Sequence, residues 1–163
     1  MSGGELIRRA ETPADVAEAR ALFEEYAATL GVDLAFQGFA EELASLPGAY
    51  APPRGCLLLA GPRDSAFGCA ALRPLPYGEA IAEVGEIKRL YVRPAARGTG
   101  LGATLARTIL AEARAIGYRE VRLDTLASMT AARALYASLG FTACPPYYRN
   151  PLPGTAYMRL ALD

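Results

Sequence analysis

One central segment constrains the fold more than any other: a strand pattern, then a glycine-rich loop, then a helix pattern. The strand pattern covers Ala82 to Val92, and the helix pattern covers Gly100 to Ile116 with Gly117 as its C-terminal stop. Between them lies Arg97 to Gly102, with the sequence Arg-Gly-Thr-Gly-Leu-Gly. A further strand pattern, Arg119 to Asp124, follows the helix. The segment therefore predicts a right-handed parallel strand–helix–strand crossover.

The glycine loop allows a ligand to approach the backbone closely. Gly98, Gly100 and Gly102 carry no side chain and permit dihedral angles that turn successive N–H groups to one side. The helix that follows adds unpaired amides and a dipole that favours an anion. Arg97 can contribute a charge-assisted hydrogen bond. The loop is thus predicted to bind a phosphate group.

Charge is unevenly distributed around this loop, although the formal net charge of the chain is +0. No acidic residue lies between Glu86 and Glu112, and five cations fall in that window: Lys88, Arg89, Arg93, Arg97 and Arg107. Two interpretations stay open, a cation cluster for a compact polyanion or a solvated face of an arginine-rich chain. The zero net charge favours neither nucleic acid nor a membrane surface as a partner.

The remaining patterns predict a single domain over residues 1–163, with no repeat and no second domain. Outside the central segment, strands are predicted at Leu6 to Arg9, Cys56 to Ala60, Ala66 to Leu72, Phe141 to Cys144 and Thr155 to Leu162, and helices from the Thr12 cap to Gly31, at Phe36 to Leu46 and at Thr130 to Leu139. This order predicts a mixed α/β (α+β) fold with helices packed on the sheet.

Composition excludes several kinds of chemistry. The chain has no histidine, so Ser-His-Asp and Cys-His catalysis and histidine metal sites are excluded. The three cysteines are widely spaced without a Cys-x-x-Cys motif, so neither a disulfide framework nor a metal site is expected. No run of apolar residues reaches the length of a membrane span, and the N-terminus lacks the apolar core of a signal peptide. A cytoplasmic location is expected.

A dinucleotide-binding fold is the rival interpretation of the loop. Gly98 to Ala103 matches Gly-x-Gly-x-x-Ala, and Asp124 stands about where a ribose-binding acid would. However, Arg93 to Arg97 separate the strand from the first glycine, where a dinucleotide turn is tight. Too few elements follow Asp124 to complete that fold. The lysine of a P-loop is missing as well, because Ala103-Thr104 follows Gly102.

Two motifs resemble the GNAT superfamily of N-acetyltransferases. Glu86 to Gly102 (Glu-Ile-Lys-Arg-Leu-Tyr-Val-Arg-Pro-Ala-Ala-Arg-Gly-Thr-Gly-Leu-Gly) is similar to the family's central motif, whose Arg/Gln-x-x-Gly-x-Gly/Ala pattern falls on Arg97, Gly100 and Gly102. Ala134 to Phe141 (Ala-Leu-Tyr-Ala-Ser-Leu-Gly-Phe) resembles its second signature. The order of elements agrees over essentially the whole chain. One position departs: Met129 stands where many members carry an asparagine.

The resemblance implies a fold and a reaction. The fold is a single GNAT-like domain, with a mixed, mostly antiparallel sheet of about six to seven strands flanked by about four helices. The reaction is direct transfer of an acetyl group from acetyl-CoA to a primary amine in a ternary complex, without a metal. The residues implied to bind acetyl-CoA are Leu90, Tyr91, Val92, Arg97, Gly98, Thr99, Gly100, Leu101 and Gly102.

Two residues receive catalytic roles by the same resemblance. Glu86 is the expected base, and strand alternation places it on one face with Lys88, Leu90 and Val92; Glu83, on the opposite face, is a second choice. Tyr136 is the expected acid, because a phenol with a pKa near 10 can protonate a thiolate whose thiol has a pKa near 8.5. Core packing is the alternative role for Tyr136.

The acceptor is expected opposite the acyl donor, near residues 30–53 and the loop of residues 145–151. Tyr147, Tyr148 and Arg149 in that loop can bind a small carboxylate-bearing substrate or form a rigid surface turn, and both interpretations stay open. A small-molecule or peptide amine is the expected partner, and a homodimer stays open as the assembly. A catalytically silent acyl-CoA sensor is the alternative function, and a dinucleotide-binding protein is the less favoured one.

Overall fold

The structure is a computed structural model that describes residues 7–76 and 83–163. Within these ranges the strands are β1 Ile7–Arg9, β2 Cys56–Ala60, β3 Gly68–Pro74, β4 Val84–Val92, β5 Glu120–Thr125, β6 Thr142–Ala143 and β7 Ala156–Ala161. The helices are α2 Pro13–Leu30, α3 Phe39–Ser45, α4 Leu101–Ile116 and α5 Thr130–Ser138, with 3-10 turns η1 Ala35–Gln37, η2 Gly48–Tyr50 and η3 Pro94–Ala96.

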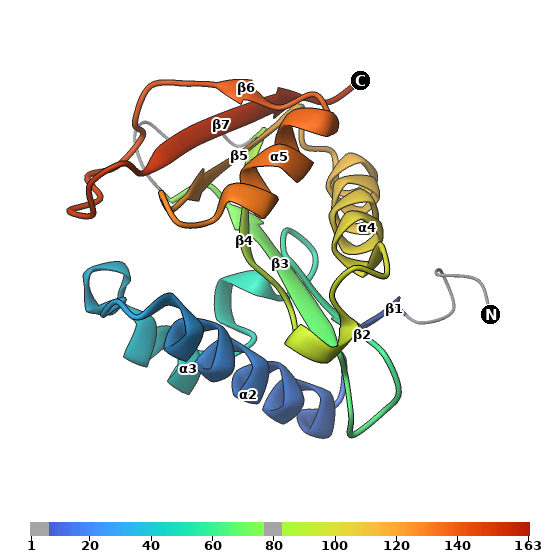
Figure 1. Cartoon of the computed structure of the whole chain (residues 1–163). Helices are drawn as coiled ribbons and strands as arrows, with labels where there is room; N and C mark the ends of the chain where they lie inside the picture. The colour runs from blue at the N-terminus through green and yellow to red at the C-terminus, as the bar shows by residue number, and fades with distance from the viewer. Residues whose placement is uncertain (1–6, 77–82) are drawn as a thin grey trace.

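The described strands form one seven-stranded sheet in the order β1-β2-β3-β4-β5-β7-β6. All neighbours pair antiparallel except β4 and β5, which pair parallel across the α4 crossover. Figure 1 shows α2 and α3 on one side of the central strands and α4 and α5 on the other. The mixed, mostly antiparallel sheet with four helices confirms the predicted fold class. Leu6 and Ala82, predicted strand ends, lie outside the described residues.

One predicted helix is wrong in its continuity. The pattern from Phe36 to Leu46 predicts a single helix, but Gly38 adopts a left-handed conformation with φ 69° and separates η1 from α3. The helix before it begins as predicted, because Thr12 and Asp15 form a reciprocal capping box. None of the described helices is both long and apolar enough to cross a membrane.

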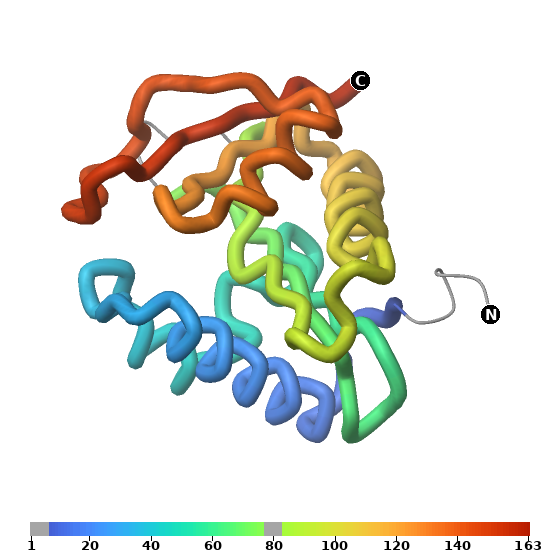
Figure 2. The backbone as a smooth tube through the Cα atoms, viewed as in Figure 1, coloured from blue at the N-terminus to red at the C-terminus, as the bar shows by residue number. Residues whose placement is uncertain are grey.

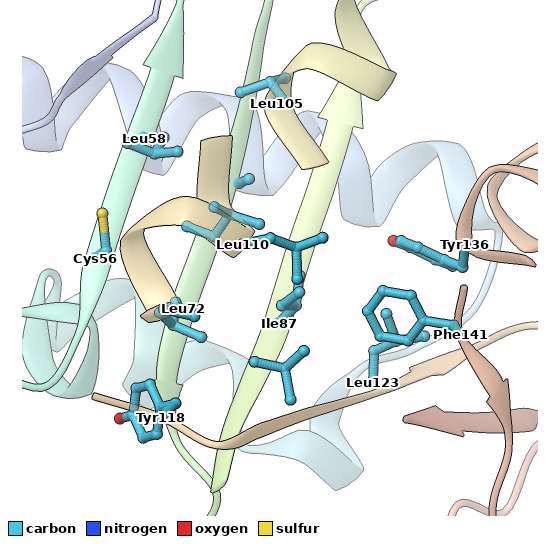
Figure 3. Packing of buried hydrophobic residues seen from close by; sticks show 14 of the residues in the cluster. Cys56, Leu58, Leu72, Ile87, Leu105, Leu110, Tyr118, Leu123, Tyr136 and Phe141 are labelled. Atoms are coloured by element: carbon cyan, nitrogen blue, oxygen red, sulfur yellow. The ribbon is translucent and has the colours of Figure 1, made fainter. Parts of the chain in front are cut away.

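Two apolar clusters hold the helices against the sheet. Under α4, Leu105 and Leu110 face Leu58, Leu72 and Ile87 of the central strands (Figure 3). A second cluster, on the opposite face, packs buried α2 residues such as Leu22 and Phe23 against β2, β3 and β4. The central strands are therefore buried on both faces, which makes them a rigid support for the segments at their ends.

A β-bulge interrupts β4. Cys69 of β3 pairs with Tyr91, but Ala71, two residues further along, pairs with Lys88, so β4 carries one extra residue. Arg89 lies at this point with φ 60°. The bulge shifts the alternation of every β4 side chain beyond it.

Because of the bulge, the prediction that Glu86, Lys88, Leu90 and Val92 share one face of β4 is wrong. Glu86 and Lys88 bond to residues on the α2/α3 side of the sheet, whereas Leu90 and Val92 pack in the α4 cluster. Strict alternation would place all four together, but one inserted residue exchanges the faces.

Strands β4 and β5 diverge after a short paired stretch. Parallel pairing covers only Val84 to Glu86 of β4 and Glu120 to Arg122 of β5. The remainder of β4, Ile87 to Val92, has no partner on that side, and the tube of Figure 2 continues from it through the glycine loop into α4. The divergence leaves a cleft in the middle of the sheet.

Candidate active site

The glycine loop has the geometry of an anion cradle. Gly98 and Gly100 have φ of 79° and 82°, a region that side chains disfavour, and a Cβ at either would meet no atom within 4 Å. Gly100 caps α4, and the helix begins at Leu101. The first amides of α4 therefore have no partner within the helix, at a surface where the loop side chains do not cover them. This arrangement suits a phosphate group.

Arg97 joins this loop to the end of β4. Its Nε donates to the Val92 carbonyl at 3.0 Å, and its guanidinium lies 6.0 Å from the centre of the Tyr91 ring. Arg97 is exposed, beside Gly98 and Thr99. The structure thus places the predicted loop residues at one site and fixes Arg97 at its edge.

The five cations of the central window do not converge on the loop. The Arg89 guanidinium donates to both carboxylate oxygens of Glu42, at 2.9 and 3.0 Å, on the α3 side. Arg93 pairs with Glu25 of α2. Lys88 also faces away from the loop, so the polyanion interpretation holds at most for Arg97 and Arg107.

The cleft between β4 and β5 encloses about 30 Å³. It is lined by Tyr26, Leu30, Leu34, Gln37, Ile87, Lys88, Arg89, Leu90, Asp124, Leu126, Met129 and Tyr136. The lining combines apolar side chains with a few converging polar groups, as ligand sites do. The polar side chains that line this cleft come from α2, η1, β4, β5 and α5.

Tyr136 reaches the cleft from α5. Its ring is buried against Phe141, and in Figure 3 its hydroxyl is directed from α5 toward β4. Burial raises the pKa of Tyr136, with smaller contributions from Tyr26 and Asp124. The hydroxyl therefore stays protonated well above neutral pH and is available as a proton donor.

Glu86, the base expected from the sequence, does not line the cleft. It is 0% exposed; Oε1 accepts from Arg73 at 2.8 Å, and Oε2 accepts from the Tyr147 hydroxyl at 2.8 Å. Both oxygens are thus engaged by neighbouring side chains. Glu83, the second choice, is more than half exposed and lies 3.8 Å from Arg119. The structure does not bring either glutamate to Tyr136.

Asp124 lines the cleft instead, from the end of β5. Its Oδ2 accepts from the Tyr148 hydroxyl and from Asn150 Nδ2, the latter at 3.3 Å. Both of the hydrogen bonds that the described residues donate to Asp124 reach Oδ2, and neither reaches Oδ1. The sequence suggested Asp124 only as a ribose ligand. Its position at the end of a strand parallel to β4 is the signal that indicates this site.

The two tyrosines of the late loop cover the polar side of the cleft. Tyr147 reaches Glu86 and Tyr148 reaches Asp124, while the Tyr157 hydroxyl donates to the Tyr148 carbonyl at 2.9 Å. Burial and the neighbouring carboxylates raise the pKa of both tyrosines. Arg149 is exposed and does not line the cleft. The loop is therefore a packed element, with two of its three predicted residues near the site.

A chain of hydrogen bonds connects Lys88 and Asp124 across the cleft. Lys88 Nζ donates to Gln37 Oε1 at 3.1 Å, Gln37 Nε2 donates to the Tyr148 hydroxyl at 3.1 Å, and that hydroxyl donates to Asp124. Sequence reasoning assigned no role to Gln37, and it considered Lys88 only as one of five cations near the loop and as a neighbour of Glu86 on one strand face. No local pattern links residues 37, 88, 124 and 148.

A larger hollow, about 1090 Å³, lies at the other end of α4. Its walls include Arg9, Tyr50 and Glu112, and they take in part of the segment 30–53 that was expected near the acceptor, but none of the residues predicted to bind acetyl-CoA or to act catalytically. Volume alone therefore does not select the candidate site, and the convergence of Asp124 and Tyr136 favours the smaller cleft.

Comparisons with known proteins identify the same family that the two sequence motifs resemble. The model of the acetyltransferase (GNAT) family matches residues 14–141. An uncharacterized N-acetyltransferase of Schizosaccharomyces pombe is 40% identical over 160 residues, 96% of this chain and 94% of its own length. An acetyltransferase structure from Streptococcus agalactiae has the same fold, with a TM-score of 0.75 at 20% identity over 96% and 97% of the two chains. The yncA structure from Salmonella typhimurium, solved with acetyl-CoA, reaches 0.67 at 24% identity over 96% and 93%.

Proposed function

The chain belongs to the GNAT family of acetyl-CoA-dependent N-acetyltransferases, and we propose that it transfers the acetyl group directly to a primary amine in a ternary complex. One observation carries this proposal: the divergence of β4 and β5 places Asp124 and Tyr136 in one cleft, beside the strand that leads to the anion cradle. A carboxylate and a phenol facing the same small space are the two proton carriers that amide formation from a thioester requires.

The glycine loop and the start of α4 are proposed to hold the pyrophosphate of acetyl-CoA. Gly98 and Gly100 leave open space where side chains would stand, so the backbone there fits a phosphate group. The acetyl donor supplies an activated carbonyl carbon. Leu90, Tyr91 and Val92 lie beyond the paired part of β4, and their backbone is proposed to align the donor along that strand.

Asp124 is proposed to receive the proton of the amine. Its Oδ1, which accepts no hydrogen bond from the described residues, can attract the ammonium, which first loses one proton to solvent so that the neutral amine can attack. Asp124 then takes the second proton as the new C–N bond forms. Glu86 accepts a hydrogen bond from the Tyr147 hydroxyl. It is proposed to position Tyr147 and not to be the base in contact with the amine.

Tyr136 is proposed to protonate the departing sulfur. As the C–S bond breaks, the thiolate takes the phenolic proton, which returns from solvent afterwards. The raised pKa of Tyr136 keeps that proton in place until the thiolate forms. Atoms balance: the ammonium loses one proton to solvent and one to Asp124, and the thiolate gains one from Tyr136.

Two measurements test the function. Acetyl-CoA should raise the melting temperature, whereas NAD should not; stabilisation by NAD alone would overturn the acyl-CoA assignment. Release of free thiol should then be measured over amino acids, polyamines, aminoglycosides and peptides. Stabilisation by acetyl-CoA without turnover of any amine would favour an acyl-CoA sensor.

A variant tests the base. Asp124→Asn should lower kcat/KM for the amine by about 10²–10⁴-fold while the Kd of acetyl-CoA is unchanged, because of the two substrates the carboxylate is proposed to contact only the acceptor. Unchanged kcat/KM would remove Asp124 from the mechanism.

A further inference from the structure

Resting on the proposed acetyl transfer, we infer that the acceptor is a zwitterion: a free amino acid whose carboxylate binds Lys88 while its amino group binds Asp124. The charges that the fold leaves available in the cleft, and the hydrogen bonds that connect them, support this class of substrate.

Three charged side chains line the cleft: Lys88, Arg89 and Asp124. Arg89 is neutralised by its two hydrogen bonds to Glu42. One cation and one carboxylate therefore remain to meet a substrate. One ammonium and one carboxylate in the cleft are complementary to an acceptor that carries one carboxylate and one ammonium.

Lys88 is the more informative of the two. It is 5% exposed, and within residues 7–76 and 83–163 its hydrogen bond to Gln37 has no second bond or ion pair beside it. An ammonium carries three donors, and burying it without an anionic partner is costly. Burial accordingly lowers the pKa of Lys88, an effect that the charge of Glu86 partly opposes. A substrate carboxylate is the partner that this site lacks.

Gln37 occupies the position that the acceptor needs. Its amide oxygen accepts from Lys88 and its amide nitrogen donates to Tyr148, which donates in turn to Asp124. An amino acid presents the same polarity, with acceptor oxygens toward Lys88 and N–H donors toward Asp124. The cleft of about 30 Å³ holds little more than a water, so the acceptor must displace this side chain.

The same charges disfavour other amines. A polyamine or an aminoglycoside would bring several positive charges to a cleft whose unpaired charges, among the described residues, are one lining carboxylate and one lining cation. A protein lysine has no carboxylate near its amino group to meet Lys88. The apolar lining, which includes Leu30, Leu34 and Leu126, indicates an amino acid with an aliphatic side chain.

The test compares matched acceptors on the native chain. Each of the twenty common amino acids is offered as the free acid and as its α-amide, and release of free thiol is measured. The free acid of at least one aliphatic amino acid should exceed its amide at least 10-fold in kcat/KM. Equal rates, or faster acetylation of amides, would overturn the inference while leaving the acetyltransferase function intact. No transfer to any amine would overturn both.

Two variants sharpen the result. Lys88→Met, an apolar side chain of similar length, should reduce the preference for the free acid to about one, and an undiminished preference would overturn the role of Lys88. Gln37→Ala should lower the KM of the free acid several-fold, because the competing amide is gone. Since Gln37 is only half-buried, this second variant remains informative if Lys88→Met fails to fold; an unchanged or raised KM would contradict the displacement of Gln37.

Discussion

The two sides of β4 present different chemical groups, backbone amides on one side and charged side chains on the other. On the α4 side, the glycine loop offers backbone amides to an anion, and the packing beneath it is apolar. On the α2/α3 side, buried charges form side-chain pairs, Glu86 with Arg73 and Arg89 with Glu42. In the proposed reaction the donor side binds with backbone groups that every residue carries, whereas the acceptor side depends on the identity of single side chains.

This difference predicts two kinds of variant. On the donor side, a change in the loop should weaken ligand binding without unfolding the protein, because the loop is at the surface. On the acceptor side, a change in a buried pair should lower stability, because breaking such a pair leaves a charge in a poorly solvated place. Tyr136 lines the cleft between the two sides, so a change there should affect the reaction itself.

The largest effect is expected at Tyr136. Tyr136→Phe should lower kcat about 10³-fold, because the proton donor is lost, and should change the Kd of acetyl-CoA by less than about 2-fold. The ring and its contact with Phe141 remain, so the melting temperature should hold. In the native chain, kcat should not fall between pH 7 and 9 on account of this group, since burial raises its pKa. Unchanged turnover would assign Tyr136 to packing alone.

The next effect is expected on the acceptor side. Glu86→Gln removes the charge that pairs with Arg73 at 2.8 Å, and the free energy of unfolding in urea should fall by about 3 kcal/mol. The matched control is Glu83→Gln, the same change in the exposed pair with Arg119, which should cost less than about 0.5 kcal/mol. Equal losses in the two variants would contradict the division between the sides.

On the donor side, Gly102 offers a matched pair of variants. A Cβ there would lie 3.8 Å from Val92 and 4.0 Å from Leu135, ordinary contacts, so Gly102→Ala should fold and bind normally. Gly102→Asp should weaken acetyl-CoA binding about 100-fold by calorimetry, because a carboxylate in the first turn of α4 repels an anion. Its melting temperature should hold or rise, since an acid suits a helix N-terminus. A large loss of stability in Gly102→Asp would contradict the expectation that changes on the donor side weaken binding without unfolding the protein.

The smallest effect is expected at the start of α2. Burial raises the pKa of Asp15, but the amides of Glu11 and Thr12 and the guanidinium of Arg8 outweigh it and hold the pKa at about 2. Because the folded pKa lies below the unfolded value, this stabilisation is present above about pH 4 and is lost as pH falls toward 2. Asp15→Asn should cost about 1 kcal/mol at pH 7 and almost nothing at pH 2 in denaturant titrations. A cost independent of pH would contradict the role of the charge.

Much of the fold was predictable because its signals are local. Alternation, caps and stop residues predicted the order of elements, and the positive φ of Gly98 and Gly100 follows from their place between a strand and a helix. The same locality limited the prediction: Gly38 divided one predicted helix, and the bulge at Arg89 moved Leu90 and Val92 to the other face. A strand pattern cannot indicate an inserted residue that only the neighbouring strand reveals.

The sequence by itself determined the donor side, because a glycine loop followed by a helix presents its amides wherever the chain carries it. Only the tertiary structure decided the acceptor side. Gln37 and Tyr148 are 111 positions apart, and Arg89 and Glu42 are 47 apart, so neither contact has a local signature. Side-chain pairs of this kind require that segments far apart in the sequence pack against each other. Glu86 shows the consequence: the resemblance of its motif predicted a base, and only the fold shows its carboxylate buried between Arg73 and Tyr147.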